Sequence, residues 1–160
     1  MISLDDLDRR LLDLLQRDAG RTLHDLGEEV GLSPSAVQRR IGRYRASGLI
    51  ERQVAVLDPA VAGGLTAIVL VTLEHESAEH HAGFAGRMLA TPEVQQCYAV
   101  AGEWDYAVVL VVADMPHCRL LGDRLFKNDA NIRRFNTLPV FERIKSGMEI
   151  PVATWKGVDP

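Results

Sequence analysis

The sequence has few cysteines, no long apolar run and none of the motifs that mark common enzyme classes. Its two cysteines, Cys97 and Cys118, stand far apart in 160 residues, which excludes a CxxC site and fits a reducing cytoplasm. No apolar stretch reaches the roughly 18 residues of a membrane-spanning helix, and the acidic start is unlike a signal peptide. No P-loop, GxSxG or Rossmann glycine pattern occurs. We therefore expect a cytoplasmic protein that has no membrane contact, no catalytic residues and no cofactor.

Basic residues are few but concentrated. The chain has 18 basic and 22 acidic side chains and a formal charge of −4. Residues 33–52 reverse this balance, with five arginines against one glutamate and a local charge of +4. An acidic protein can still bind a polyanion at one basic segment. This segment is the candidate for a nucleic-acid contact.

The first part of the chain has the pattern of three short helices. Leucines recur at helical spacing along one face of the first helix: Leu4, Leu7, Leu11, Leu14 and Leu15. Its first turn carries three acids, which the helix dipole favours: Asp5, Asp6 and Asp8. Thr22 and Ser33-Pro34 are start signals for the second and third helices, and Gly31 allows a sharp turn between them. This arrangement is a helix-turn-helix.

The third helix would be the recognition helix. Val37, Ile41 and Tyr44 form its inward stripe. Polar side chains that suit bases and phosphates are the candidate DNA contacts: Ser33, Ser35, Gln38, Arg39, Arg40 and Arg43. Arg40 lies toward the flank of the stripe, which favours a phosphate contact or an internal ion pair over base reading. The alternatives are a solvated basic face, or a helix-turn-helix that makes only protein contacts.

The second part of the chain alternates strand and helix patterns in the order β-α-β-β-α-β, which predicts a ferredoxin-like α+β fold. We expect domains at 1–57 and 66–160, joined by a linker at 58–65, with a strand-like run at 49–57. Proline interrupts the last predicted strand, 132–144, and implies an edge or a bulge. Helices cover only one face of such a sheet, yet two of its strands are apolar on both faces. A second copy is the simplest cover, so we predict a homodimer.

Several motifs resemble the leucine-responsive regulator (Lrp/AsnC) family. They are Leu32-Ser33-Pro34-Ser35-Ala36-Val37, Arg39-Arg40-Ile41 and Gly48-Leu49-Ile50 in the first half, and Ala101-Gly102-Glu103-Trp104-Asp105-Tyr106 in the second. The resemblance covers nearly the whole chain, although Tyr44 stands where leucine is usual. It implies a prokaryotic transcription regulator with a winged-helix-like DNA-binding domain and a sensing and oligomerisation domain. Its partners would be double-stranded DNA, a small effector such as an amino acid or related metabolite, and further copies of itself, with tetramer and octamer left open.

The resemblance also implies an effector site between sensing domains. The candidate residues are Gly102, Glu103, Trp104, Asp105, Tyr106 and Thr137. Gly102 allows close backbone approach, Asp105 could pair with an α-ammonium group, and Trp104 could cover the ligand. Without the resemblance, the loop is an ordinary hairpin in which Asp105 caps the turn.

A histidine-rich loop leaves a metal-responsive regulator as an alternative. Imidazoles can bind Zn²⁺ or Cu²⁺, but an HExxH site needs its histidines four apart on one helix. His75 and His80 are five apart, with His81 next to the latter. We assign no metal site, and a small-molecule-binding module without DNA binding is the other alternative.

Overall fold

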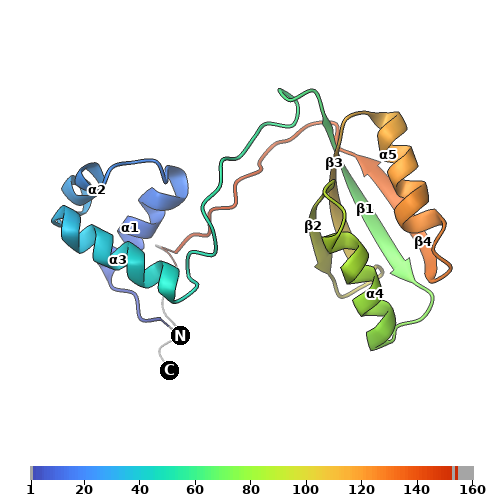
Figure 1. The fold of residues 1–160 in the computed structure, drawn as a ribbon, viewed down its shortest axis with the longest axis horizontal. Coiled ribbons are helices and arrows are strands. Elements are labelled where there is room, and N and C mark those ends of the chain that lie inside the picture. Colours follow the sequence, from blue (N-terminus) through green and yellow to red (C-terminus); the bar gives the residue numbers. More distant parts are fainter. Residues whose placement is uncertain (1, 153, 155–160) are drawn as a thin grey trace. The chain divides into compact units, whose positions relative to one another are not determined.

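The computed structural model describes residues 2–152 and 154, which form two compact units. The first unit comprises residues up to Ala55 together with the described residues from Lys145 onward. The second unit comprises Val56–Ile144. Figure 1 shows the elements of both. We describe each unit by itself.

Three helices build the first unit: α1 (Asp6–Arg17), α2 (Leu23–Val30) and α3 (Pro34–Ala46). The predicted caps are confirmed. The Thr22 hydroxyl accepts from the backbone N–H of Asp25, and the Ser33 hydroxyl accepts from that of Ala36. Gly31 ends α2 with a φ of 72°, a left-handed conformation that favours glycine. Local chemistry therefore sets the start and end of these helices.

Apolar side chains from all three helices form one core. Its fully buried members include Leu11, Leu26, Val37 and Tyr44. Leu49 and Ile50 pack against this core, but the expected strand at 49–57 is wrong, since these residues form none. Val54 and Val56 are 66% and 80% exposed. A β-like composition cannot form a strand without a partner strand, so no wing strand follows the helices in this part of the described chain.

The segment after residue 144 packs with the first unit. The sequence pattern predicts a second domain at 66–160, whereas the described residues of this segment group with the first unit. Gln16 exchanges two hydrogen bonds with the backbone of Ile150, at 3.1 and 2.8 Å. The Val152 side chain is buried in the helical core. The buried Val152 side chain and the two hydrogen bonds of the Gln16 side chain thus hold this segment against α1.

The second unit has the predicted β-α-β-β-α-β order. Its elements are β1 (Leu65–Leu73), α4 (Ala78–Leu89), β2 (Val94–Ala99), β3 (Tyr106–Val112), α5 (Met115–Gly122), a π-helical turn η1 (Asp123–Lys127) and β4 (Ile132–Pro139). The strands form an antiparallel sheet in the order β2-β3-β1-β4 (Figure 1). The last strand ends at Pro139 rather than at 144, and β4 is an edge strand as the proline predicted.

The two faces of the sheet differ in burial. Alternate residues of β1 and β3, such as Val69 and Leu110, are buried with side chains of α4 and α5. The open face carries the residues between them, of which the following are apolar and at least partly exposed: Ile68, Leu70, Ala107, Val109 and Val111. Among the described residues, no helix has both the length and the apolar character that spanning a membrane requires.

Candidate functional site

The start of α3 is held by a close approach of the turn to α2. A Cβ placed on Gly27 would lie 2.4 Å from the carbonyl oxygen of Leu32. Glycine at this position therefore lets the turn pack directly on α2. Together with the left-handed Gly31 and the Ser33 cap, it sets where α3 begins and which face it buries.

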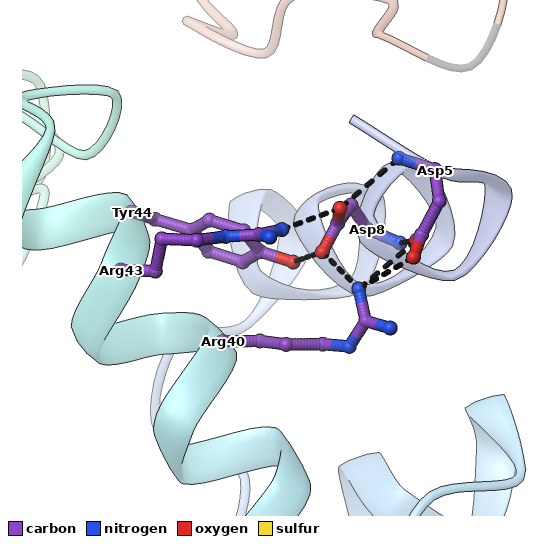
Figure 2. A network of polar contacts seen from close by, with 5 residues as sticks. All are labelled: Asp5, Asp8, Arg40, Arg43 and Tyr44. Carbon is purple, nitrogen blue, oxygen red and sulfur yellow. Dashed lines mark hydrogen bonds and ion pairs between the residues drawn. The ribbon is translucent and has the colours of Figure 1, made fainter. Parts of the chain in front are cut away.

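The predicted DNA contacts divide into two groups. Ser35, Gln38 and Arg39 are exposed, on the side of α3 opposite to its buried stripe. Ser33 is also exposed, but its hydroxyl caps the helix and lies 3.1 Å from that of Ser35. Arg40 and Arg43 point instead toward α1, where they meet a buried carboxylate (Figure 2).

Asp8 is the centre of this contact. Its side chain is 1% exposed, and it accepts hydrogen bonds from Arg40, from Arg43 at 2.5 Å and from the Tyr44 hydroxyl at 2.5 Å (Figure 2). Arg40 also pairs with Asp5 at 2.9 Å. The internal ion pair considered for Arg40 is therefore present, and this pairing accounts for its low exposure of 18%.

The network strongly favours the charged form of Asp8. Burial by itself raises the pKa of this carboxyl, but the hydrogen bonds from Tyr44, Arg40, Asp5 and Arg43 outweigh it and lower the pKa to about 2. Burial and the bond to Asp8 raise the pKa of Tyr44 above its ordinary value. Both groups thus keep their ordinary neutral-pH forms.

Sequence reasoning placed Asp8 in the first turn for its effect on the helix dipole and missed this role. A signal was present, since Asp8 falls at helical spacing among leucines that pack in the core. An acid on a buried face needs a partner, but the sequence does not say which one.

The predicted effector loop lies between β2 and β3. Gly102 has a φ of 141°, a backbone conformation that side chains rarely adopt. Asp105 already has a partner, because its carboxylate accepts from the backbone N–H of Leu73 at 2.7 Å. Its own N–H donates to the carbonyl of Val71 at 2.9 Å. Asp105 therefore anchors the loop to the end of β1.

Arg134 of β4 joins this loop and was not among the predicted residues. Its guanidinium lies 4.2 Å from the centre of the Trp104 ring. It donates to the carbonyl of Glu103 at 3.2 Å and to the Glu103 carboxylate at 2.9 Å. The strand register explains the contact, because Arg134 stands opposite Thr72, next to the end of β1. Pairing across the sheet is not visible in the sequence.

Two other predicted effector residues face the helices. Thr137 stands opposite Val69, whose side chain is in the core between sheet and helices, and cross-strand partners share a face. Tyr106 is buried on the same face, where its hydroxyl lies 2.5 Å from Nδ1 of His81 and its ring stacks on Phe84. Of the residues discussed at this loop, Glu103, Trp104 and Arg134 therefore contact one another, whereas Tyr106 and Thr137 face the core.

The histidines of the loop at 75–80 make a hydrogen bond to a helix cap and a contact between their rings. Nδ1 of His80 lies 2.8 Å from the Ser77 hydroxyl that caps α4, and His75 stands 6.0 Å away between ring centres. Among residues 2–152 and 154, no group of three or more potential ligand side chains is arranged to hold a metal ion.

Comparison with known proteins covers both units. One family model, the AsnC-type helix-turn-helix domain, matches residues 4–45, and another, the Lrp/AsnC ligand binding domain, matches residues 66–150. The DNA-binding transcriptional activator DecR of Escherichia coli is 35% identical over 150 residues, covering 93% of this chain and 99% of its own.

Solved structures of related proteins superpose on nearly the same length of this chain. An AsnC family transcriptional regulator from Agrobacterium tumefaciens superposes with a TM-score of 0.86 at 32% identity, covering 93% of this chain and 97% of its own. A transcriptional regulator from Neisseria meningitidis in complex with L-Met gives 0.85 at 27% identity, covering 94% and 97%. The chain therefore belongs to the Lrp/AsnC family of DNA-binding transcriptional regulators.

Proposed function

We propose that the exposed side of α3 reads DNA, with Ser35, Gln38 and Arg39 facing base edges in the major groove. The observation that carries this proposal is their common exposure near the capped N-terminus of α3, opposite the buried stripe. Arginine and glutamine suit bidentate contacts to guanine and adenine. Ser33 supports this surface as the helix cap, while Arg40 and Arg43 support it from the Asp8 network.

The proposed DNA-binding form is a homodimer whose sensing sheets pack on each other through the open face. Leu70, Val109 and Val111 are apolar and remain partly exposed on a sheet whose other face is buried. Burial of such side chains favours association, and two related recognition helices would read half-sites related by symmetry. A regulator of transcription acts where the chromosome lies, so the cytoplasm is its proposed location.

The proposed effector is an amino acid bound at the loop of Glu103 and Trp104. One structural relative is a complex with L-Met, and the loop and β4 together offer an aromatic ring in Trp104 and a cation in Arg134. A ligand that binds one arrangement of the assembly better than another would shift its DNA affinity.

The DNA-reading role is tested by the loss of one arginine. We would select a duplex from a random pool with the full-length protein and measure its affinity by fluorescence anisotropy at several salt concentrations. Arg39→Ala is expected to weaken binding to the selected duplex by about 10- to 100-fold and to relax specificity at one base position, with little change in the salt slope. Arg119→Ala, an exposed arginine of α5, is the matched control.

Equal affinities for the Arg39 variant and the control would contradict the proposed reading face. Sedimentation of the unmodified protein in the same buffer tests the dimer, and a monomer at binding concentrations would contradict it.

The effector proposal is tested by thermal unfolding with each of the twenty amino acids. A ligand of the folded state raises the unfolding midpoint with dose. We expect Trp104→Ala to abolish the response and Phe141→Ala, which removes an exposed aromatic ring elsewhere, to retain it. No response to any amino acid would contradict the effector class while leaving the DNA proposal intact.

A further inference from the structure

A buried carboxylate connects α1 to the recognition helix without facing the DNA-reading residues itself. We propose that Asp8 is a positioning residue for DNA recognition, which holds Arg40 and Arg43 against α1 and so keeps these two cations from binding phosphates indiscriminately. The inference rests on the proposed DNA-reading role of α3. It assigns Asp8 an effect on the specificity of binding rather than on its strength alone.

The carboxylate is saturated by four donors (Figure 2). Oδ1 accepts from Arg40 and from the Tyr44 hydroxyl. Oδ2 accepts from Arg43 at 2.5 Å and from the backbone N–H of Asp5 at 3.0 Å. An ionised carboxylate has about four acceptor positions, so this site has no place for another donor. Such a buried group holds its partners firmly, because loss of either guanidinium would leave charge poorly compensated.

The spacing of the partners sorts the arginines of α3. Arg40, Arg43 and Tyr44 follow each other at i, i+3 and i+4, which places all three on the side of the helix that meets α1 (Figure 2). Arg39, one residue earlier, is turned about 100° from Arg40 and is exposed. Of the four arginines of α3, the network therefore engages Arg40 and Arg43 and leaves Arg39 and Arg45 exposed.

The degree of engagement differs between the two arginines. Arg40 is 18% exposed and pairs with both Asp5 and Asp8. Arg43 is 47% exposed and reaches Asp8 with one terminal nitrogen. Arg40 is thus withheld from DNA, whereas Arg43 is held in one orientation with half of its surface accessible.

Withholding cations matters because phosphate contacts carry no sequence information. Each arginine that neutralises a phosphate strengthens binding to every duplex and steepens its dependence on salt. An internal counter-charge removes part of that indiscriminate attraction. Asp8 therefore raises the ratio of specific to non-specific affinity.

The test compares Asp8→Asn with unmodified protein on two duplexes, the selected site and a scrambled sequence of the same composition. Asparagine keeps the shape of the side chain but removes the charge that holds Arg40 and Arg43. We expect tighter binding to the scrambled duplex, a salt slope that is steeper by about 1 to 2, and a specificity ratio that falls by roughly 10-fold.

Asp6→Asn is the matched control, since it removes one acid from the same turn of α1 at an exposed position. It should leave the slope and the ratio nearly unchanged. An equal change in both variants would overturn the proposal, because net charge alone would then explain it. Equal weakening on both duplexes with an unchanged slope would also overturn it, because Asp8 would then be only a structural residue.

A second variant covers the case in which Asp8→Asn does not fold. Arg40→Gln retains Arg43 and Tyr44 as partners of Asp8. If Arg40 is withheld, this variant keeps the salt slope on scrambled DNA, whereas a slope reduced by about 1 would identify a phosphate contact and overturn the proposal. Failure of the unmodified protein to bind any selected duplex would refute the proposed function itself, and is distinguishable from all these outcomes.

Discussion

Acid should weaken the first unit through the titration of Asp8. Its side chain is 1% exposed, and the hydrogen bonds to its charged form lower its pKa from 3.8 to about 2. A lowered pKa means that the charged form stabilises the folded state. This contribution is therefore complete above about pH 4 and is lost as the pH falls toward 2. The difference between the two pKa values corresponds to about 2 kcal/mol in the free energy of unfolding.

The measurement is urea unfolding of the unmodified protein and of Asp8→Asn at a series of pH values. Backbone amide signals of Val37 and Ile41, two core residues of α3, would report on the first unit. Asparagine does not titrate, so the difference in unfolding free energy between the two proteins isolates Asp8. We expect this difference to shrink by about 2 kcal/mol between about pH 5 and about pH 2, with half of the loss near pH 3.

A constant difference across this range would refute the reasoning. Asp8 would then bind protons equally well in the folded and unfolded chains, and the network in Figure 2 would not stabilise its charge. Asp6→Asn, measured in parallel, controls for the loss of one acid at an exposed position of the same turn.

Two further predictions concern the turn and the loop. Gly31→Ala should lower the unfolding free energy by about 1 kcal/mol, because its φ of 72° strains an alanine although its Cβ would meet nothing within 4 Å. Gly27→Ala should lower it clearly more, because its Cβ would lie 2.4 Å from the Leu32 carbonyl oxygen. Equal costs by urea unfolding would contradict the close approach of the turn to α2. Asp105→Ala should destabilise the second unit by about 1–3 kcal/mol, because it leaves the N–H of buried Leu73 unpaired. An unfolding midpoint equal to that of the unmodified protein would show that Asp105 does not anchor the loop.

Local interactions explain why most elements could be predicted. Ser33, Thr22 and Ser77 cap their helices through N–H groups three residues away, so each signal is contained in a short stretch of sequence. Short continuous runs of apolar and mostly β-branched residues likewise indicated β1 and β3. The predicted strand at 49–57 failed because a strand depends on a partner elsewhere, and Val54 and Val56 are exposed instead.

The candidate site was only partly predictable for the same reason. The exposure of Gln38 and Arg39 follows from helical spacing relative to Val37 and Ile41. Arg134 contacts the predicted effector loop through the pairing of β1 with β4, which links residues far apart in the chain.

The sequence by itself determined the helix-turn-helix, the order of the sensing domain and the face of α3 that is exposed. Only the tertiary structure decided that Arg40 and Arg43 pair with Asp8. Asp8 falls on an apolar face, and its position alone indicates burial. Whether a buried charge is stable depends on which donors other elements bring within hydrogen-bonding distance, and packing of α3 on α1 sets those distances.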